Sequence, residues 1–137
     1  LEDIKDANGN SYSYETNVEN AVHWGVETYI ELNVVKLFTS NSKIGTVSFF
    51  NSFSYDNATY VNGPYKGNQV EYAPPTINRF GLTYAIKGFS ITFIISNTAK
   101  QYTDANNTVY STTALEGIIP QYTVMDWSST IKIKNYI

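Results

Sequence analysis

Two neighbouring stretches of alternating apolar and polar residues, within Ile77 to Asn97, constrain the fold of this chain most strongly. The apolar positions are Phe80, Leu82, Tyr84 and Ile86 before a short break, and Phe89, Ile91, Phe93 and Ile95 after it. A period of two is typical of β-strands with one apolar side. The break is Lys87-Gly88, and a glycine permits the positive φ that a two-residue hairpin turn requires. The sequence therefore predicts a β-hairpin with arms of about nine to eleven residues, the length of a tilted strand that crosses a bilayer.

Two fold classes contain hairpins of this kind, the soluble β-sandwich and the membrane β-barrel. Strands of soluble sheets are usually shorter, with about five or six residues, but alternation alone does not separate the two classes. Aromatic residues make up 15% of the chain, with 12 Tyr and 7 Phe, and charged residues also make up only 15%. Because a typical globular domain has about 25% charged residues, this composition favours long β-strands over a helical enzyme.

The composition also excludes several classes of protein. The chain contains no Cys, which rules out a disulfide scaffold and a thiolate metal site. The formal net charge is −3 and no stretch of the sequence is basic, so we expect no nucleic-acid partner. No apolar run approaches the roughly 18 residues of a membrane-spanning helix, although barrel strands would escape that criterion. We expect no cofactor.

The rest of the chain adds three long strand candidates to the hairpin. Together, the five predicted strands are Trp24–Phe38, Ile44–Tyr60, Thr76–Ile86, Phe89–Lys100 and Gln121–Lys134. A helix competes for the first of these, because Glu, Leu and Lys are good helix formers, but the alternation and the β-branched residues favour a strand. We also expect a brief strand over Ser11–Thr16.

The predicted loops alternate in length. Residues 39–43 and Lys87-Gly88 are short, whereas Val61–Thr76 and Ala99–Pro120 are long and rich in turn-forming residues. Outer-membrane barrels have this asymmetry, with tight turns at one end and long loops at the other. A soluble sandwich has no reason to put its long loops at one end, so the loop lengths favour the barrel.

Five long strands are too few to close a barrel, since the smallest single-chain barrels have about eight. An open sheet edge in lipid would leave backbone groups unpaired. The chain also starts at Leu1 without Met or a signal peptide, which agrees with a piece of a longer protein. We therefore expect an all-β fold, an antiparallel up-and-down meander in which residues 1–137 form one partial domain of a large transmembrane β-barrel.

Three stretches resemble a known family. They are NAVHWGVE (Asn20–Glu27), APPTINRF (Ala73–Phe80), and KQYTDANNT (Lys100–Thr108) together with IPQYTVMDW (Ile119–Trp127). In order and spacing they resemble the C-terminal barrel region of TonB-dependent outer-membrane receptors of the ferric-citrate type. The second stretch departs from the family pattern, because the His often found there is absent.

The resemblance implies a function for the whole receptor: energy-coupled import of a ferric chelate or siderophore across the bacterial outer membrane. It implies three partners, namely the ferric chelate, outer-membrane lipid, and TonB through a plug region that this chain does not contain. The closing strands of the family are also absent, so we expect no transport by this segment alone. The alternative function is that of a secreted β-sandwich that binds carbohydrate through exposed Tyr and Trp side chains.

Arg79 is the candidate ligand-binding residue. It is the only Arg in the chain, and it falls on the polar face of its strand, beside the long loop Val61–Thr76. A planar guanidinium suits a carboxylate-rich anion such as ferric citrate. The competing interpretation is a salt bridge in the barrel wall to Glu27, Glu31 or Asp126, which is the commoner use of Arg in such walls.

No other residues suggest chemistry. His23 is the only His, and a lone His in a polar turn does not form a metal site. Glu27 and Glu31 are four residues apart on a predicted strand, too far for a carboxylate pair at about 3.3 Å per residue. Without a catalytic constellation we do not expect an enzyme. The outward pattern instead favours interfacial aromatic girdles at Tyr55, Tyr84 and Trp127.

Overall fold

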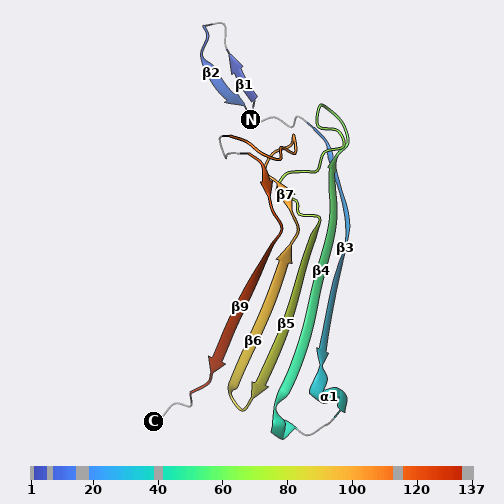
Figure 1. Cartoon of the computed structure of the whole chain (residues 1–137), viewed down its shortest axis with the longest axis vertical. Coiled ribbons are helices and arrows are strands. Elements are labelled where there is room, and N and C mark those ends of the chain that lie inside the picture. The colour runs from blue at the N-terminus through green and yellow to red at the C-terminus, as the bar shows by residue number, and fades with distance from the viewer. Residues whose placement is uncertain (1, 6–7, 15–18, 39–41, 113–115, 134–137) are drawn as a thin grey trace.

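A single antiparallel sheet of five strands makes up most of the chain. The computed structural model describes residues 2–5, 8–14, 19–38, 42–112 and 116–133. The strands, in their order across the sheet, are β3 (Ala21–Asn33), β4 (Thr46–Tyr60), β5 (Thr76–Ile86), β6 (Phe89–Thr98) and β9 (Tyr122–Ile131). Each long strand pairs with the next long strand along the chain (Figure 1), so the predicted all-β up-and-down meander is confirmed.

Two small strand pairs accompany the sheet. β1 (Glu2–Lys5) pairs with β2 (Ser11–Tyr14), which confirms the brief predicted strand over its first four residues; residues 15 and 16 lie outside the described residues. β7 (Gln101–Tyr102) pairs with β8 (Ile118–Ile119) within the second long loop. The prediction of Ala99–Pro120 as a plain loop therefore missed this ladder.

The predicted strand Trp24–Phe38 is wrong in its last five residues, which form the short helix α1 (Val34–Phe38). The side chain of Asn33 explains the switch, because its Oδ1 accepts a hydrogen bond from the backbone N–H of Lys36 at 3.1 Å, as a helix N-cap does. The next strand starts at Thr46 rather than Ile44. A 3₁₀ turn, η1 (Ser42–Ile44), precedes it, followed by Gly45 with φ +85°.

The other strand ends lie close to the prediction. β5 has the predicted bounds, whereas β6 ends at Thr98 instead of Lys100. β9 ends at Ile131, short of the predicted Lys134, which lies outside the described residues. The turn at Lys87 and Gly88 has φ values of +35° and +85°, as a two-residue hairpin turn requires.

The register divides the side chains between two faces of the sheet. Phe49, Leu82, Phe93 and Trp127 lie directly opposite one another across four neighbouring strands, and therefore share one face. Ser52, Arg79 and Ser96 are opposite one another on the other face. We call these the apolar face and the polar face. The alternation predicted around the hairpin is thus confirmed.

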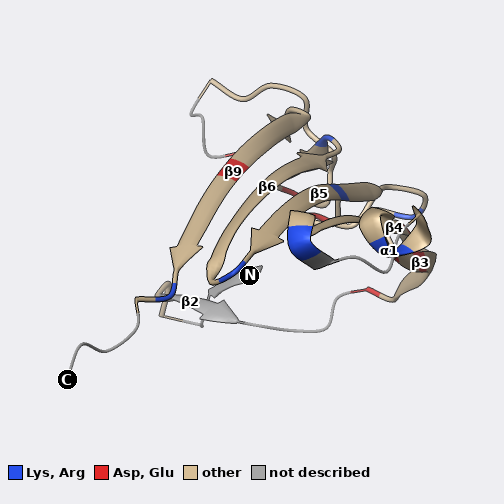
Figure 2. Cartoon of the chain, turned by 90° about the horizontal axis from the view of Figure 1, so that it is seen from below, with Lys and Arg blue, Asp and Glu red and all other residues tan. Residues whose placement is uncertain are grey.

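No second layer covers the apolar face in the described part of the chain. The only buried apolar residue there is Ala58, whereas Trp127 is 74% exposed and Met125 66% exposed. Figure 2 shows the sheet from one end as a single layer. A β-sandwich would bury these side chains against a second sheet, so that alternative is contradicted.

The two ends of the sheet differ. The turn between β5 and β6, together with α1 and η1, lies at one end, and both long loops lie at the other (Figure 1). Both long loops therefore share one end, as predicted, but the short turn predicted at residues 39–43 is wrong, because the connection from β3 to β4 covers residues 34–45. None of the helices in the described residues is long and apolar enough to cross a membrane.

Candidate functional site

Arg79 lies in the middle strand of the sheet, on the polar face and between two serines. Ser52 of β4 and Ser96 of β6 flank it directly, and Gly81 is the next residue on the same face of β5. Arg79 itself is exposed. The residues directly opposite Arg79 are small, and its guanidinium is open to a ligand on this face.

The salt bridge considered for Arg79 does not form. Within the described parts of the chain, the Arg79 side chain makes no ion pair or side-chain hydrogen bond. Its backbone carbonyl accepts from Asn51 Nδ2 at 3.1 Å. A free guanidinium beside two serine hydroxyls retains all five of its N–H donors for an anion.

An aromatic surface lies beside Arg79 on the polar face. The rings of Tyr29 and Phe50 stack at 6.1 Å with an interplanar angle of 28°. Phe50 covers Gly81, where an added Cβ would lie 2.0 Å from Phe50 Cε1. Tyr29 Oη also donates to Glu31 Oε2 at 2.9 Å. One feature of the sequence indicated this aromatic cluster, namely the aromatic residue at position 50 on an otherwise polar side of its predicted strand.

A cleft of about 540 Å³ lies on the polar face toward the long loops. At its wall, His23 Nδ1 and Asp56 Oδ2 are 3.0 Å apart. Gly25 lies between His23 and Glu27, and an added Cβ there would be 2.0 Å from the backbone oxygen of Tyr55. The pairing of β3 with β4 brings His23 and Asp56 together across 33 residues of sequence, and no sequence pattern signalled that contact.

The two long loops bind each other. The backbone N–H of Gln69 donates to Asn107 Oδ1 at 2.8 Å, and Asn107 Nδ2 donates back to Gln69 O at 2.7 Å. The backbone N–H of Tyr72 also donates to Tyr102 O at 2.9 Å. Asp104 organises the second loop, since its carboxylate accepts from the backbone N–H groups of residues 106 and 108. The loops therefore form one connected structure above the cleft.

Tyr60 at the end of β4 is tied to the first long loop. Its Oη donates to Glu71 Oε2 at 2.6 Å. Burial raises the pKa of Tyr60 to about 12, and the hydrogen bond to Glu71 acts in the same direction. This contact secures the loop to the sheet.

Comparisons with known proteins bear on the fold. No family model matches the chain, and no curated protein sequence matches it. A solved structure does match, that of the ferric citrate transporter FecA in the unliganded form, with a TM-score of 0.75 and 23% sequence identity. The match covers 84% of this chain and 17% of the FecA chain.

The fold is that of a segment of FecA. The expected architecture, a segment of a barrel, is therefore confirmed. The solved structure that matches is also of the ferric-citrate type that the three sequence stretches resemble. This chain spans about a sixth of the length of FecA, according to the 17% coverage. At 23% identity the likeness concerns the fold.

Proposed function

We propose that this chain is a wall segment of a TonB-dependent receptor barrel in the bacterial outer membrane, and that the whole receptor imports a ferric chelate of the citrate type. One observation carries the proposal: a single-layer sheet leaves a broad apolar face uncovered, interrupted at Asn51, and carries mostly polar residues on its opposite face. A transmembrane barrel has this arrangement, with the apolar face toward lipid and the polar face toward the lumen. The likeness to the FecA segment supports it.

The height of the apolar face fits a bilayer. On β5 it consists of four successive outward residues, from Phe80 to Ile86, and β6 has four as well, from Phe89 to Ile95. At about 3.3 Å per residue these span roughly 20 Å between the first and last Cα, and the side chains extend that further. The apolar band of outer-membrane barrels is about 25 Å tall.

The apolar face also slants across the sheet as a barrel requires. It runs from Trp24 to Leu32 on β3, centred on Thr28, and from Met125 to Ile131 on β9, centred on Ser128. The strand pairings, followed across the sheet, place Thr28 of β3 in the same row as Thr123 of β9. Thr123 comes five residues before Ser128, so the centre of the apolar face shifts by five residues between these two strands. That offset is about 16 Å over four strand spacings of about 4.8 Å each, which corresponds to a strand tilt of about 40°. Outer-membrane strands tilt by about 35–45°.

Two of the predicted girdle residues fit the proposal. Tyr55 contacts Trp24 edge-to-face at 5.6 Å, toward the long-loop end of the apolar face. Tyr84 is near the opposite end, where its Oη donates to Ile44 O at 3.1 Å. Trp127 is instead interior, between Met125 and Ile131 on β9. Amphipathic rings at both ends are typical of membrane boundaries.

Arg79 supports an anionic ligand. Its exposed guanidinium has no carboxylate partner in the described residues and faces the proposed lumen between Ser52 and Ser96. In the whole receptor, Arg79→Ala should weaken binding of ferric citrate about ten- to a hundred-fold, as expected for a charge-assisted contact of about 1.5–3 kcal/mol. Arg79→Lys should recover part of the loss, because an ammonium does not make a bidentate contact.

The same variants test whether Arg79 is instead structural. Because no ion pair is broken, Arg79→Ala should leave the thermal midpoint of the barrel unchanged. Lys66→Ala, which removes an exposed cation from the first long loop, serves as the control for a general charge effect. Unchanged ferric citrate affinity in Arg79→Ala would remove this residue from the binding site.

A further inference from the structure

Lysines from four separate segments gather at the short-turn end of the sheet. They are Lys36 in α1, Lys43 in η1, Lys87 in the turn between β5 and β6, and Lys132 directly after β9. All four are exposed, and α1, η1 and the turn contain no Asp or Glu. Figure 2 views the chain from this end, with the lysine positions in blue. We call these four residues the basic rim.

Large apolar residues adjoin the basic rim. Lys36 is followed by Leu37 and by Phe38, which is 84% exposed. Lys132 is followed by Ile133, which is 81% exposed. A lysine in such surroundings lays its aliphatic stem along apolar surface while its ammonium reaches the polar layer beyond. The rim thus joins exposed apolar residues to positive charge at this end of the sheet.

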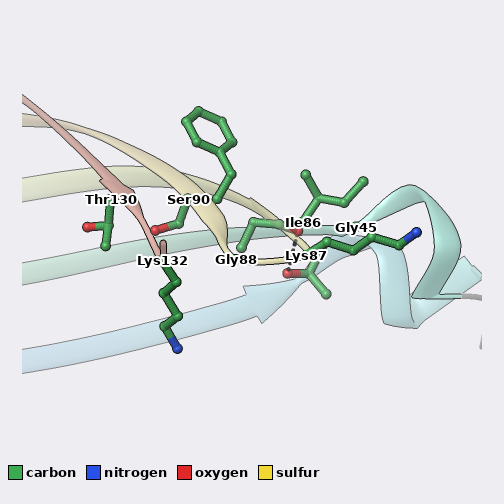
Figure 3. A pocket seen from close by; sticks show the side chains of 10 residues that line it. Gly45, Ile86, Lys87, Gly88, Ser90, Thr130 and Lys132 are labelled. Carbon is green, nitrogen blue, oxygen red and sulfur yellow. Dashed lines mark hydrogen bonds between the residues drawn. The ribbon is translucent and has the colours of Figure 1, made fainter. Parts of the chain in front are cut away.

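The rim is spread out and does not converge on one point. A shallow cleft of about 390 Å³ is lined by the β5–β6 turn and the end of β9, and Lys87 and Lys132 both border it. Figure 3 shows their side chains extending in different directions, away from each other. The five strands make the rim about 20 Å long, at about 4.8 Å per strand spacing. Charges distributed in this way suit an extended anionic surface better than a single small anion.

The opposite end of the molecule carries charges of both signs. The long loops and adjoining strand ends carry Asp56, Glu71 and Asp104, which pair with His23, Tyr60 and loop backbone amides respectively. Carboxylates therefore accompany the cations at the long-loop end, whereas α1, η1 and the β5–β6 turn carry lysines without Asp or Glu. A membrane-embedded wall with this polarity would meet anionic headgroups at its short turns.

We propose that the basic rim binds the anionic headgroups of phospholipids in the leaflet that borders the short turns. The proposal rests on the membrane-wall function, since the rim meets headgroups only if the apolar face is in lipid. Each lysine near an anionic membrane surface contributes about five-fold to partitioning. The contribution weakens as salt screens the surface charge.

The test compares two double variants of equal charge. The full chain is diluted from urea into vesicles of phosphatidylcholine alone, or of equal parts phosphatidylcholine and phosphatidylglycerol, and bound protein is measured by flotation. Lys87→Gln/Lys132→Gln should lose about 25-fold in partitioning to the anionic vesicles and little to the neutral ones. Lys66→Gln/Lys100→Gln, at the long-loop end, should change neither. High salt should remove the difference between the two doubles.

The remaining outcomes each decide a separate point. Lys87→Arg/Lys132→Arg should retain the preference for anionic vesicles, and a loss there would contradict a role for charge. If both Gln doubles lose binding equally, or if the rim double keeps the anionic preference, the lipid proposal is wrong, and an acidic protein segment becomes the better occupant. If the wild-type chain binds neither kind of vesicle, the membrane-wall function itself fails.

Discussion

Gln69 and Asn107 exchange two hydrogen bonds and so lock the two long loops together, although 38 residues separate them in the sequence. Asn107 has φ +56°, in the left-handed region that Asn tolerates better than most residues. The side-chain amide of Asn107 accepts from the backbone N–H of Gln69 and donates to its carbonyl, as the backbone of a neighbouring strand would. Asn107 therefore supplies two of the hydrogen bonds that join the long loops, beside the backbone bond from Tyr72 to Tyr102.

Replacing Asn107 should loosen the connection between the first long loop and the second. Asn107→Gly keeps the backbone conformation but removes both hydrogen bonds, at about 1 kcal/mol each. Asn107→Ala should cost about 1 kcal/mol more, because alanine disfavours the left-handed region. Hydrogen exchange at the Gln69 amide should accelerate in both variants when measured in detergent micelles. Unchanged protection of that amide would contradict the locking role.

Tyr60→Phe should produce a pH-dependent loss of stability. The pKa of Tyr60 in the folded chain, about 12, exceeds the ordinary value near 10, so folding holds this proton more tightly. The stabilisation is complete below a pH of about 10 and is lost as the pH rises toward 12. The variant should therefore be less stable than wild type by about 1–2 kcal/mol at neutral pH, with the difference shrinking in alkaline solution. Denaturant unfolding at several pH values measures it, and a difference between the two proteins that does not change with pH would contradict the prediction.

Gly81→Ala should destabilise the sheet through Phe50. The added Cβ would lie 2.0 Å from Phe50 Cε1, and the ring must move, at a cost of about 1–3 kcal/mol. In a Phe50→Ala background the same substitution should cost little, which a double-mutant cycle measures. Gly25→Ala provides the contrast. Its Cβ would meet the backbone oxygen of Tyr55, so Tyr55→Ala should not rescue it.

The two faces of β9 should differ in how strongly an added charge weakens insertion. Trp127→Arg puts a cation on the apolar face and should weaken insertion into vesicles by about 2–4 kcal/mol, as at the middle of a bilayer. Ser128→Arg, one residue later on the polar face, should have a much smaller effect. Equal effects of the two substitutions would argue against lipid contact at the apolar face.

The chain without detergent should not behave as a stable soluble monomer. The apolar face is far larger than the few hundred Å² that soluble proteins usually expose, on the order of 300–600 Å². Size-exclusion chromatography should therefore show aggregates in plain buffer and a uniform species in detergent. A sharp monomeric peak in buffer, with a cooperative melt, would contradict the barrel interpretation.

Much of the fold followed from local sequence. The alternation of residues 80–86 and 89–95 determined which side chains share a face, because the side-chain period of a strand is set by its own backbone. Lys87 and Gly88 indicated the hairpin for an equally local reason. The sequence erred at residues 34–38, where the side chain of Asn33 caps a helix and overrides the alternation.

Other features depended on which strands and loops meet in space. Arg79 was recognisable as a polar-face residue from its neighbours, but only the strand register showed that it lies between two serines and away from a carboxylate. The His23–Asp56 contact, the loop lock at Gln69, and the basic rim each join segments distant in the chain. A sequence pattern reports the periodicity of one segment. These contacts form between segments that the strand pairing brings together across long loops. Only the tertiary structure therefore brought four scattered lysines to one end of the sheet.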